Sequence, residues 1–569
     1  MAIVLVYCVV HAFDPPRLNW GDAESDYNTM MAGRNFQHYG FLTLKLTPYL
    51  LDPAVMSAGD SALIYTHYPQ LPDLMNGVLR TAFGMNDLVQ FRFVALAFSF
   101  SALFFIYSLI RAYWPRDVAQ LALGLWVVNP LWIQHADYLH HLPYAMFFGS
   151  GALYFLTRYL RADRHVRDLA LSGAFMFFVF AASYDYWIFV PLLAAAITFG
   201  HFRGVTWQGG RTLGVLALCA ILALLAKWST NAWVLGGISA FVHDMRFQLV
   251  ERATNQAVKI HYTDGIWPTL YGRANRFFSL LIFPVTLFWA TLPALRRRWL
   301  SVMPSLSSPV INPMVVLLAA LPFLCLFTEL WIGQYYPTLL VLPFYAIGCA
   351  SLALLLLNGA GRMTRFAGAA LAFALFANSL TELLSFKKAY FDRSAIASLK
   401  ANLDSLADPG QHILVDHNFD AAYRYYFSHN IVELILNPPG HYAASLQYYA
   451  NPRLIRVAPP RGALFIHHKR LADELYDKSY YYILGRVGLW GPWGNPEAYH
   501  SELDAFITAR DSELLARVAE RGTKIVDTDA YEIWRLRPTT FQPDSTQRPG
   551  ETLGAAPGKD ESHLTKIDR

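Results

Sequence analysis

FRFVALAFSFSALFFIYSLIRAYWPR, residues 91–116, begins with a mostly apolar run and ends with Arg111 and Arg116 on either side of a short aromatic turn. A helix needs about 20 apolar residues to cross the hydrocarbon core of a bilayer. Arginine just beyond such a run is typical of the cytoplasmic end of a membrane helix. This stretch therefore predicts one membrane-spanning helix and its orientation.

Similar apolar runs recur on both sides of this stretch. Because the backbone can cross lipid only as a helix or a closed barrel, they predict an α-helical polytopic membrane protein with about eleven spans. The runs cover residues 1–13, 91–110, 118–132, 142–157, 168–182, 186–200, 212–227, 277–294, 312–328, 334–357 and 366–385. The first run lacks the basic start and cleavage site of a secretory signal, so we expect it to remain as a membrane helix.

Arginine is concentrated in alternate gaps between the runs. The arginine-rich gaps contain Arg111, Arg116, Arg158, Arg161, Arg164, Arg167, Arg203, Arg211, Arg296, Arg297, Arg298, Arg362 and Arg365. The short gaps 132–142, 183–187 and 329–333 contain neither Lys nor Arg. Since arginine-rich loops face the cytoplasm, we expect the first outer loop 14–90, the loop 228–276 and the residues after the last run to lie on the other side.

The composition divides the chain into parts. Hydrophobic residues make up 55% of the 569 residues and charged residues 15%, against about 45–50% and about 25% in soluble domains. The apolar excess falls in residues 1–385, the predicted transmembrane domain. Residues 386–540 alternate strand-like and helical runs, which predicts an extracytoplasmic α/β domain. Residues 541–569 are rich in Pro, Gly, Ser, Thr and charge and are predicted to be disordered.

Within the second domain we expect strands at His412–Asp416, Leu454–Val457, Ala463–His467 and Tyr531–Leu536, and a helix over Ser501–Glu520. The net charge of +5 is modest and no basic run is interleaved with aromatic residues, so nucleic acid is not an expected partner. The four cysteines lie singly in apolar stretches. They are expected to be buried small side chains rather than disulfides or metal ligands.

The first outer loop opens with Trp20-Gly21-Asp22-Ala23-Glu24-Ser25-Asp26-Tyr27, which places three carboxylates just beyond the first span. In a helix Asp22 and Asp26 would share a face, and Glu24 would point away from it. Such a group of acids can bind a cation, or one of them can deprotonate an acceptor hydroxyl. The alternative is a solvated helix start, where the helix dipole favours acids.

Other candidate residues lie at the same predicted membrane face. His67 and Tyr68 lie between aromatic residues and prolines, which predicts a rigid segment at the interface or a plain turn. The next outer gap reads His135-Ala136-Asp137-Tyr138-Leu139-His140-His141, and ionisable residues at the edge of a span are functional candidates. His135 and Asp137 are candidate ligands of a divalent metal ion, although their spacing matches no zinc signature. Asp185 lies among aromatic residues, a composition that suits a sugar site or an interfacial aromatic belt.

Cations are expected near these acids. Lys227 ends the seventh run, and Arg273 and Arg276 precede the eighth. An arginine can bind two phosphate oxygens at once, although contact with lipid headgroups would also explain these positions. Gln334 and Tyr335 begin the tenth run at the same face. We therefore expect a substrate site at the outer membrane face.

The order of these motifs resembles that of the membrane glycosyltransferases of the C-type fold (GT-C), which use lipid-phosphate sugar donors. They include the dolichyl-phosphate-mannose protein mannosyltransferases and the bacterial lipid A aminoarabinose transferases. The resemblance rests on the acidic motif ending in Tyr27, on Tyr39-Gly40-Phe41, and on His67-Tyr68-Pro69-Gln70-Leu71-Pro72. Further along, it rests on Arg92, Asp137 and Tyr335-Tyr336-Pro337.

The resemblance implies an inverting transfer from a polyprenyl-phosphate sugar to a hydroxyl of a glycolipid, a cell-envelope polysaccharide or a protein, in the plasma (inner) membrane. Asp22 or Glu24 would be the catalytic base. The family usually has adjacent Asp and Glu, but here Ala23 separates them, so both stay candidates. Asp137 would assist, at a metal ion or by holding the acceptor. The arginines would neutralise the departing lipid phosphate.

Two other classes of function remain alternatives. A membrane transporter or lipid flippase would be expected to have charged groups near the midplane or an internal repeat, whereas the predicted span interiors are nearly free of charge and no repeat is seen. A non-catalytic membrane scaffold would bind envelope polymer through its outer domain. Such a scaffold should tolerate alanine at Asp22, Glu24 and Asp137, and an enzyme should not.

The arginine pattern generates a topological prediction. A reporter that is active only in the cytoplasm, fused after residue 540, should be silent, because the second domain is expected on the same side as Asp22 and Asp137. The same reporter fused within the arginine-rich gap 158–167 should be active. A bright signal from the first fusion would reverse the orientation and move the expected site to the cytoplasm.

Overall fold

The structure of the protein is a computed structural model. It describes residues 2–14, 23–50, 53, 64–66, 68–161, 164–246, 271, 274–299, 312–327, 336–359, 361–385, 393–407, 412–415, 430–433, 464–469, 515–516, 518–520 and 522–537.

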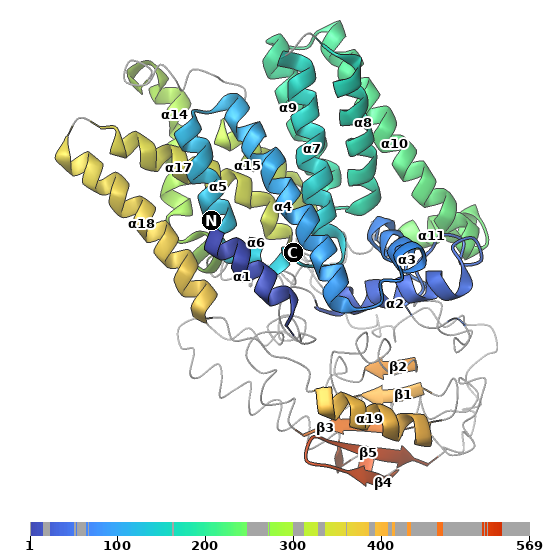
Figure 1. Cartoon of the computed structure of the whole chain (residues 1–569). Helices are drawn as coiled ribbons and strands as arrows, with labels where there is room; N and C mark the ends of the chain where they lie inside the picture. The colour runs from blue at the N-terminus through green and yellow to red at the C-terminus, as the bar shows by residue number, and fades with distance from the viewer. Residues whose placement is uncertain are drawn as a thin grey trace, which may run out of the picture.

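A helical bundle occupies most of the chain (Figure 1). Each predicted apolar run overlaps a helix of this bundle. These helices are α1 (Ala2–Ala12), α4 (Leu88–Tyr113), α5 (Arg116–Val127), α7 (His141–Arg161), α8 (Val166–Ala182), α9 (Tyr186–Phe202), α10 (Trp207–Leu235), α14 (Ile282–Trp299), α15 (Pro313–Leu326), α17 (Leu342–Leu357) and α18 (Arg362–Ser385). Four of the described helices are long and apolar enough to cross a membrane: Leu88–Tyr113, Trp207–Leu235, Pro337–Leu357 and Arg362–Leu384. The count of about eleven spans stays a prediction.

The run predicted at 118–132 is not one helix. α5 ends at Val127, and a short helix, α6 (Pro130–His135), follows it. The Asn129 side chain caps α6 by accepting a hydrogen bond from the Leu131 N–H at 3.0 Å, and Pro130 occupies the first helical turn, where its missing N–H costs nothing. Asn129 Nδ2 also donates to the Phe277 carbonyl at 2.6 Å. The break therefore joins this part of the chain to η4 (Ala274–Phe278), a π-helix.

Three helices gather at one end of the bundle: α2 (Ala23–Tyr39), α3 (Leu71–Phe83) and α11 (Ile238–Arg246) (Figure 1). α2 and α3 belong to the predicted first outer loop and pack closely against each other. A Cβ at Gly33 would lie only 1.8 Å from Asn76 Oδ1, so this contact requires glycine. The end of α4 with Arg111 and the end of α7 with Arg158 and Arg161 lie at the other end of the bundle.

Arg92 ties the first helix to the bundle. Its side chain is almost fully buried, and its Nη1 donates to the Asp14 carbonyl at 2.7 Å and to the Ala12 carbonyl at 3.4 Å. A buried guanidinium needs such acceptors, because removing it from water is costly. The end of α1 is thereby fixed against the start of α4.

The second part of the chain contains a five-stranded mixed sheet with the strand order β2-β1-β3-β5-β4. The strands are β1 (His412–Val415), β2 (Asn430–Glu433), β3 (Leu464–His468), β4 (Gly522–Asp527) and β5 (Tyr531–Leu536). β1 pairs in parallel with β2 and β3, and β5 pairs antiparallel with β3 and β4. α19 (Arg393–Leu406) packs on the sheet, where Ser398 Oγ and Asn402 Nδ2 lie within hydrogen-bonding distance of the Tyr531 hydroxyl.

Three of the predicted strands correspond to β1, β3 and β5, whereas β2, β4 and α19 were not predicted. The strand predicted at Leu454–Val457 and the tail 541–569 lie outside the described residues. Of the helix predicted over Ser501–Glu520, the structure describes residues 515–516 and 518–520, which are helical. The extracytoplasmic position of this domain stays a prediction.

Candidate functional site

Thr66, Tyr68 and Gln70 are held to the C-terminal part of α10. Lys227 Nζ donates to the Thr66 carbonyl at 3.0 Å and also to the Tyr68 carbonyl. One turn further along α10, Asn231 Nδ2 donates to the same Thr66 carbonyl at 3.0 Å and Asn231 Oδ1 accepts from Gln70 at 3.1 Å. The sequence predicted Lys227 as a substrate-binding cation. The structure places its ammonium against backbone carbonyls, 5.3 Å from the centre of the Tyr184 ring.

A second connection joins the acidic motif of the first outer loop to the gap that contains Asp137. Asp26, buried in the first turns of α2, accepts a hydrogen bond from the Leu139 N–H through Oδ1 at 2.7 Å. Asp137, two residues before Leu139, is also buried. The structure thus brings together two acidic segments that are more than 100 residues apart in the sequence.

Asp185, His141 and His140 form a buried chain of polar groups. His141 Nε2 lies 3.1 Å from Asp185 Oδ2, and both side chains are 1% exposed. His141 Nδ1 lies 2.9 Å from His140 Nδ1, so one of the two rings donates to the other. Burial raises the pKa of Asp185 to about 8 and lowers the pKa of His140. Among the described residues Asp185 Oδ1 has no hydrogen-bond partner, which leaves a buried carboxyl oxygen for a hydroxyl or a water.

Aromatic side chains surround this polar chain. The Tyr68 ring lies 5.4 Å from the ring of His140, 5.2 Å from that of His141 and 5.4 Å from that of Tyr184. The Tyr138 ring contacts the same two histidines, at 6.1 and 5.8 Å. Aromatic faces beside carboxyl groups suit a sugar ring, because the apolar side of the sugar stacks and its hydroxyls hydrogen-bond.

α3 contributes a further acid. Asp73 is 1% exposed, and burial raises the pKa of its carboxyl to about 7, with the Thr29 hydroxyl and the Lys227 ammonium opposing that rise. Asp73 Oδ2 has no hydrogen-bond partner among the described residues. A carboxyl in this state can exist protonated or ionised near neutral pH, so it can donate or accept a hydrogen bond there.

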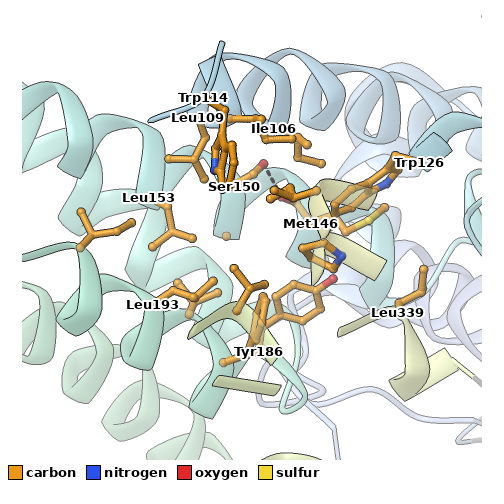
Figure 2. Close-up of a pocket in the computed structure, with 18 residues that line it drawn as sticks. Ile106, Leu109, Trp114, Trp126, Met146, Ser150, Leu153, Tyr186, Leu193 and Leu339 are labelled. Atoms are coloured by element: carbon orange, nitrogen blue, oxygen red, sulfur yellow. Dashed lines mark hydrogen bonds between the residues drawn. The ribbon is translucent and has the colours of Figure 1, made fainter. Parts of the chain in front are cut away.

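An apolar cavity of about 80 Å³ lies inside the bundle (Figure 2). Tyr186, which follows Asp185 directly, lines it at one place, and Trp114, in the turn after Arg111, lines it at another. The other described lining residues are mostly aliphatic and aromatic and come from α4, α5, α7, α9, α15, the 3₁₀ helix η7 (Tyr336–Val341) and α17. Ser150 is the one hydroxyl of a serine or threonine in the lining, and it donates to the Met146 carbonyl at 2.6 Å. The cavity therefore suits a hydrocarbon chain.

The structure describes only part of the predicted site. Tyr68, Asp137, Asp185 and Lys227 belong to the connected elements described above. His135 lies nearby, 5.8 Å from the Tyr138 ring between ring centres. The predicted site residues that lie outside the described residues are Asp22, His67, Arg273, Gln334 and Tyr335, and for Glu24 and Arg276 only the backbone is described.

The described residues do not form a site that fits a metal ion. His135 Nδ1 lies 2.9 Å from the Leu131 carbonyl, a contact that orients the imidazole ring. Within the described part of the chain no group of three or more His, Cys, Asp or Glu side chains is arranged to hold a metal. No step proposed below passes through a metal ion.

Two residues of the candidate site were not predicted from the sequence. Asp244 of α11 accepts a hydrogen bond from Thr66 Oγ1 at 3.0 Å, and nothing in its local sequence indicates this. The sequence does contain a pattern that indicates Asp73, because Asp73, Asn76 and Arg80 share one face of α3 at helical spacing. That polar face is buried, while Val78 and Phe83 on the helix are exposed. A helix with this inverted pattern is expected at a lipid boundary, with its polar face toward the protein.

Comparison with known proteins identifies the fold. No model of a known protein family matches the chain, and no curated protein matches it in sequence. In structure, the chain is similar to the oligosaccharyltransferase of Archaeoglobus fulgidus in a complex with Zn and sulfate, with a TM-score of 0.52 and 13% identity over 84% of this chain and 69% of that one. It is also similar to the archaeal oligosaccharyltransferase AglB from Archaeoglobus fulgidus in complex with an inhibitory peptide and a dolichol-phosphate, with a TM-score of 0.52 and 12% identity over 86% of this chain and 71% of that one.

ArnT from Cupriavidus metallidurans bound to undecaprenyl phosphate is also similar, with a TM-score of 0.43 and 15% identity over 94% of this chain and 96% of that one. The oligosaccharyltransferase match is the basis of the fold assignment. It confirms the predicted resemblance at the level of the fold: the chain has the GT-C fold.

The buried Asp185 carboxyl predicts a pH-dependent stability. Its folded pKa of about 8 lies above its ordinary value of 3.8, so its contribution to stability is complete below pH ~4 and is lost as the pH rises to about 8. Asp185→Asn should therefore flatten the fall in thermal unfolding midpoint between about pH 5 and 8, measured in detergent by tryptophan fluorescence.

The matched control is Asp117→Asn, which changes an exposed acid in the first turn of α5. It should keep the slope of the unmodified protein. Equal slopes for the Asp185→Asn variant and the unmodified protein would mean that Asp185 is ionised in the folded state.

Proposed function

We propose that this protein is an inverting glycosyltransferase that moves a sugar from a polyprenyl-phosphate donor to an acceptor hydroxyl at the extracytoplasmic face of the membrane. The GT-C fold supports the general kind of reaction. The observation that supports it most strongly in this chain is the Asp26–Leu139 hydrogen bond. It holds the acidic motif of the first loop beside the segment with Asp137, at one end of the bundle.

In the proposed reaction the acceptor oxygen attacks the anomeric carbon of the donor. The bond from that carbon to the phosphate oxygen breaks, and its electron pair leaves with the lipid phosphate. The base, Asp22 or Glu24, takes the proton of the acceptor hydroxyl. Attack on the side opposite the leaving phosphate inverts the anomeric configuration.

The other residues have binding and positioning roles. The unpartnered oxygens of Asp73 and Asp185 are proposed to accept hydrogen bonds from sugar or acceptor hydroxyls, which would relieve the cost of burying them without a partner. Tyr68 offers an aromatic face for the sugar. Arg273 and Arg276 are proposed to bind the phosphate, since an arginine can contact two of its oxygens and stabilise the charge that develops on leaving.

The donor's hydrocarbon tail requires an apolar path. Exposing a lipid chain to water costs about 0.8 kcal/mol per CH₂, so the tail has to stay in the bilayer or in an apolar cavity. The cavity of Figure 2 begins at Tyr186, next to Asp185, and is lined by hydrocarbon and aromatic side chains. We place the first isoprenoid units there. The AglB complex with dolichol-phosphate is a precedent for this class of ligand on the same fold.

The reaction can be tested directly. Purified protein is incubated with polyprenyl-phosphate sugars and a lipid-extract acceptor, and the release of free polyprenyl phosphate is measured. We expect release with at least one donor, and its loss in the Asp137→Ala variant, with Asp117→Ala as an active control. If no polyprenyl-phosphate sugar is consumed, while the control proteins stay folded, the proposed function is wrong.

The acids of the first loop should differ in importance. Only one position can lie within hydrogen-bonding reach of the acceptor, so one of Asp22→Ala and Glu24→Ala should lower turnover by about 10²–10⁴-fold while donor affinity is retained. Asp26→Asn keeps an oxygen that can accept from the Leu139 N–H and should retain most activity, whereas Asp26→Ala should lower thermal stability. Arg273→Ala or Arg276→Ala should weaken donor binding first.

Turnover and donor affinity have to be measured separately for each variant. Equal loss of turnover in the Asp22, Glu24 and Asp26 alanine variants, or full retention in all of them, would exclude general-base catalysis by this loop.

A further inference from the structure

A separate pocket is lined by residues at the ends of α4 and α7. These helix ends lie across the bundle from α2, α3 and α11 (Figure 1). The volume of the pocket is about 240 Å³. Its lining consists of Ala112, Tyr154, Thr157, Arg158 and Arg161. Nothing in the proposed sugar transfer uses this pocket.

Both arginines are held in place by neighbouring groups. Arg161 lies over the Tyr113 ring, 5.2 Å from its centre, and donates to the Ala112 carbonyl. Arg158 lies 5.8 Å from the centre of the Tyr154 ring. Stacking on aromatic rings orients a guanidinium without using up its N–H donors. The two positive groups are therefore arranged in advance of any ligand.

The positive charge of the pocket is only partly balanced. Arg158 Nε lies 3.5 Å from Asp168 Oδ2, while half of the Arg158 side chain remains exposed. Arg161 forms no ion pair with an acid among the described residues. The described residues thus contribute two arginines and one acid, a net positive charge that fits an anion.

An apolar surface continues from the pocket toward the middle of the bundle. The Tyr154 ring, which lines the pocket, contacts the rings of Phe105 at 5.4 Å and Phe104 at 6.2 Å between centres. Phe104 is 59% exposed and lies about two and a half helical turns before Tyr113, in a helix long and apolar enough to span a membrane. A hydrocarbon chain attached to an anion in the pocket could therefore lie along Tyr154 and Phe104.

We propose that this pocket binds an anionic phospholipid of the adjacent leaflet, with its phosphate between Arg158 and Arg161 and an acyl chain along Phe104. Basic pockets between membrane helices on the cytoplasmic side are suited to acidic headgroups, and the arginine pattern predicts that this end of the bundle is cytoplasmic. A phospholipid has both groups that this surface can bind: its phosphate would contact the guanidiniums, and its hydrocarbon chain would contact the aromatic rings.

The test uses the full-length protein in detergent. Thermal stabilisation and lipid-bound species in native mass spectrometry are measured with phosphatidylglycerol and with phosphatidylcholine as the neutral lipid. We expect selective binding of phosphatidylglycerol. Arg158→Gln and Arg161→Gln should each weaken it about fivefold, from a contribution of about 1 kcal/mol per arginine near a membrane surface. Arg158→Lys, which keeps the charge, should lose less than Arg158→Gln.

The matched control is Arg116→Gln, which removes an exposed arginine at the same end that does not line the pocket. It should bind phosphatidylglycerol as the unmodified protein does. Arg161 also donates to Ala112, so its variant is interpreted only if its elution profile is unchanged; Arg158→Gln is the independent test. Equal binding of both lipids, no effect of Arg158→Gln, or full competition by inorganic phosphate would each overturn the proposal.

Discussion

Lys227 has an ammonium group that is buried in the C-terminal part of α10. It requires acceptors because an unpaired buried charge is very costly. The acceptors are the carbonyls of Thr66 and Tyr68. This requirement fixes Thr66 and Tyr68 to α10. The Tyr68 ring then lies against the rings of His140, His141 and Tyr184. Asn231, one turn further along α10, donates to the same Thr66 carbonyl, so two side chains of this helix hold the first outer loop.

The other polar contacts build on this attachment. Asp26 holds α2 to the Leu139 backbone, and Asp185 holds His141. The result is a bundle with two chemically different ends. One end has buried acids, imidazoles and aromatic rings, which suit recognition of a neutral polar molecule such as a sugar. The other has arginines stacked on aromatic rings, which suit the headgroups of anionic lipids.

The bundle was predictable because the bilayer imposes length and composition on its helices, and each apolar run overlaps a described helix. The break at Asn129–Pro130 was not predicted, although Pro130 indicates it. For the site, the sequence predicted candidate residues but not which of them contact one another. Its contacts join residues 44, 113 and 161 positions apart, and hydropathy contains no information about such pairing. Asp73 illustrates the difficulty, because its role depends on the burial of a polar helix face that usually faces water.

The central claim is that a polyprenyl-phosphate donor binds at the end of the bundle where α2, α3 and α11 gather. The most direct measurement is photocrosslinking with a polyprenyl phosphate that has a diazirine next to its phosphate, followed by peptide mapping. The account predicts labelling of peptides that contain residues 64–70, 135–141, 184–187 or 273–276. Labelling confined to the arginine-rich end, at residues 111–116 or 154–161, would contradict it.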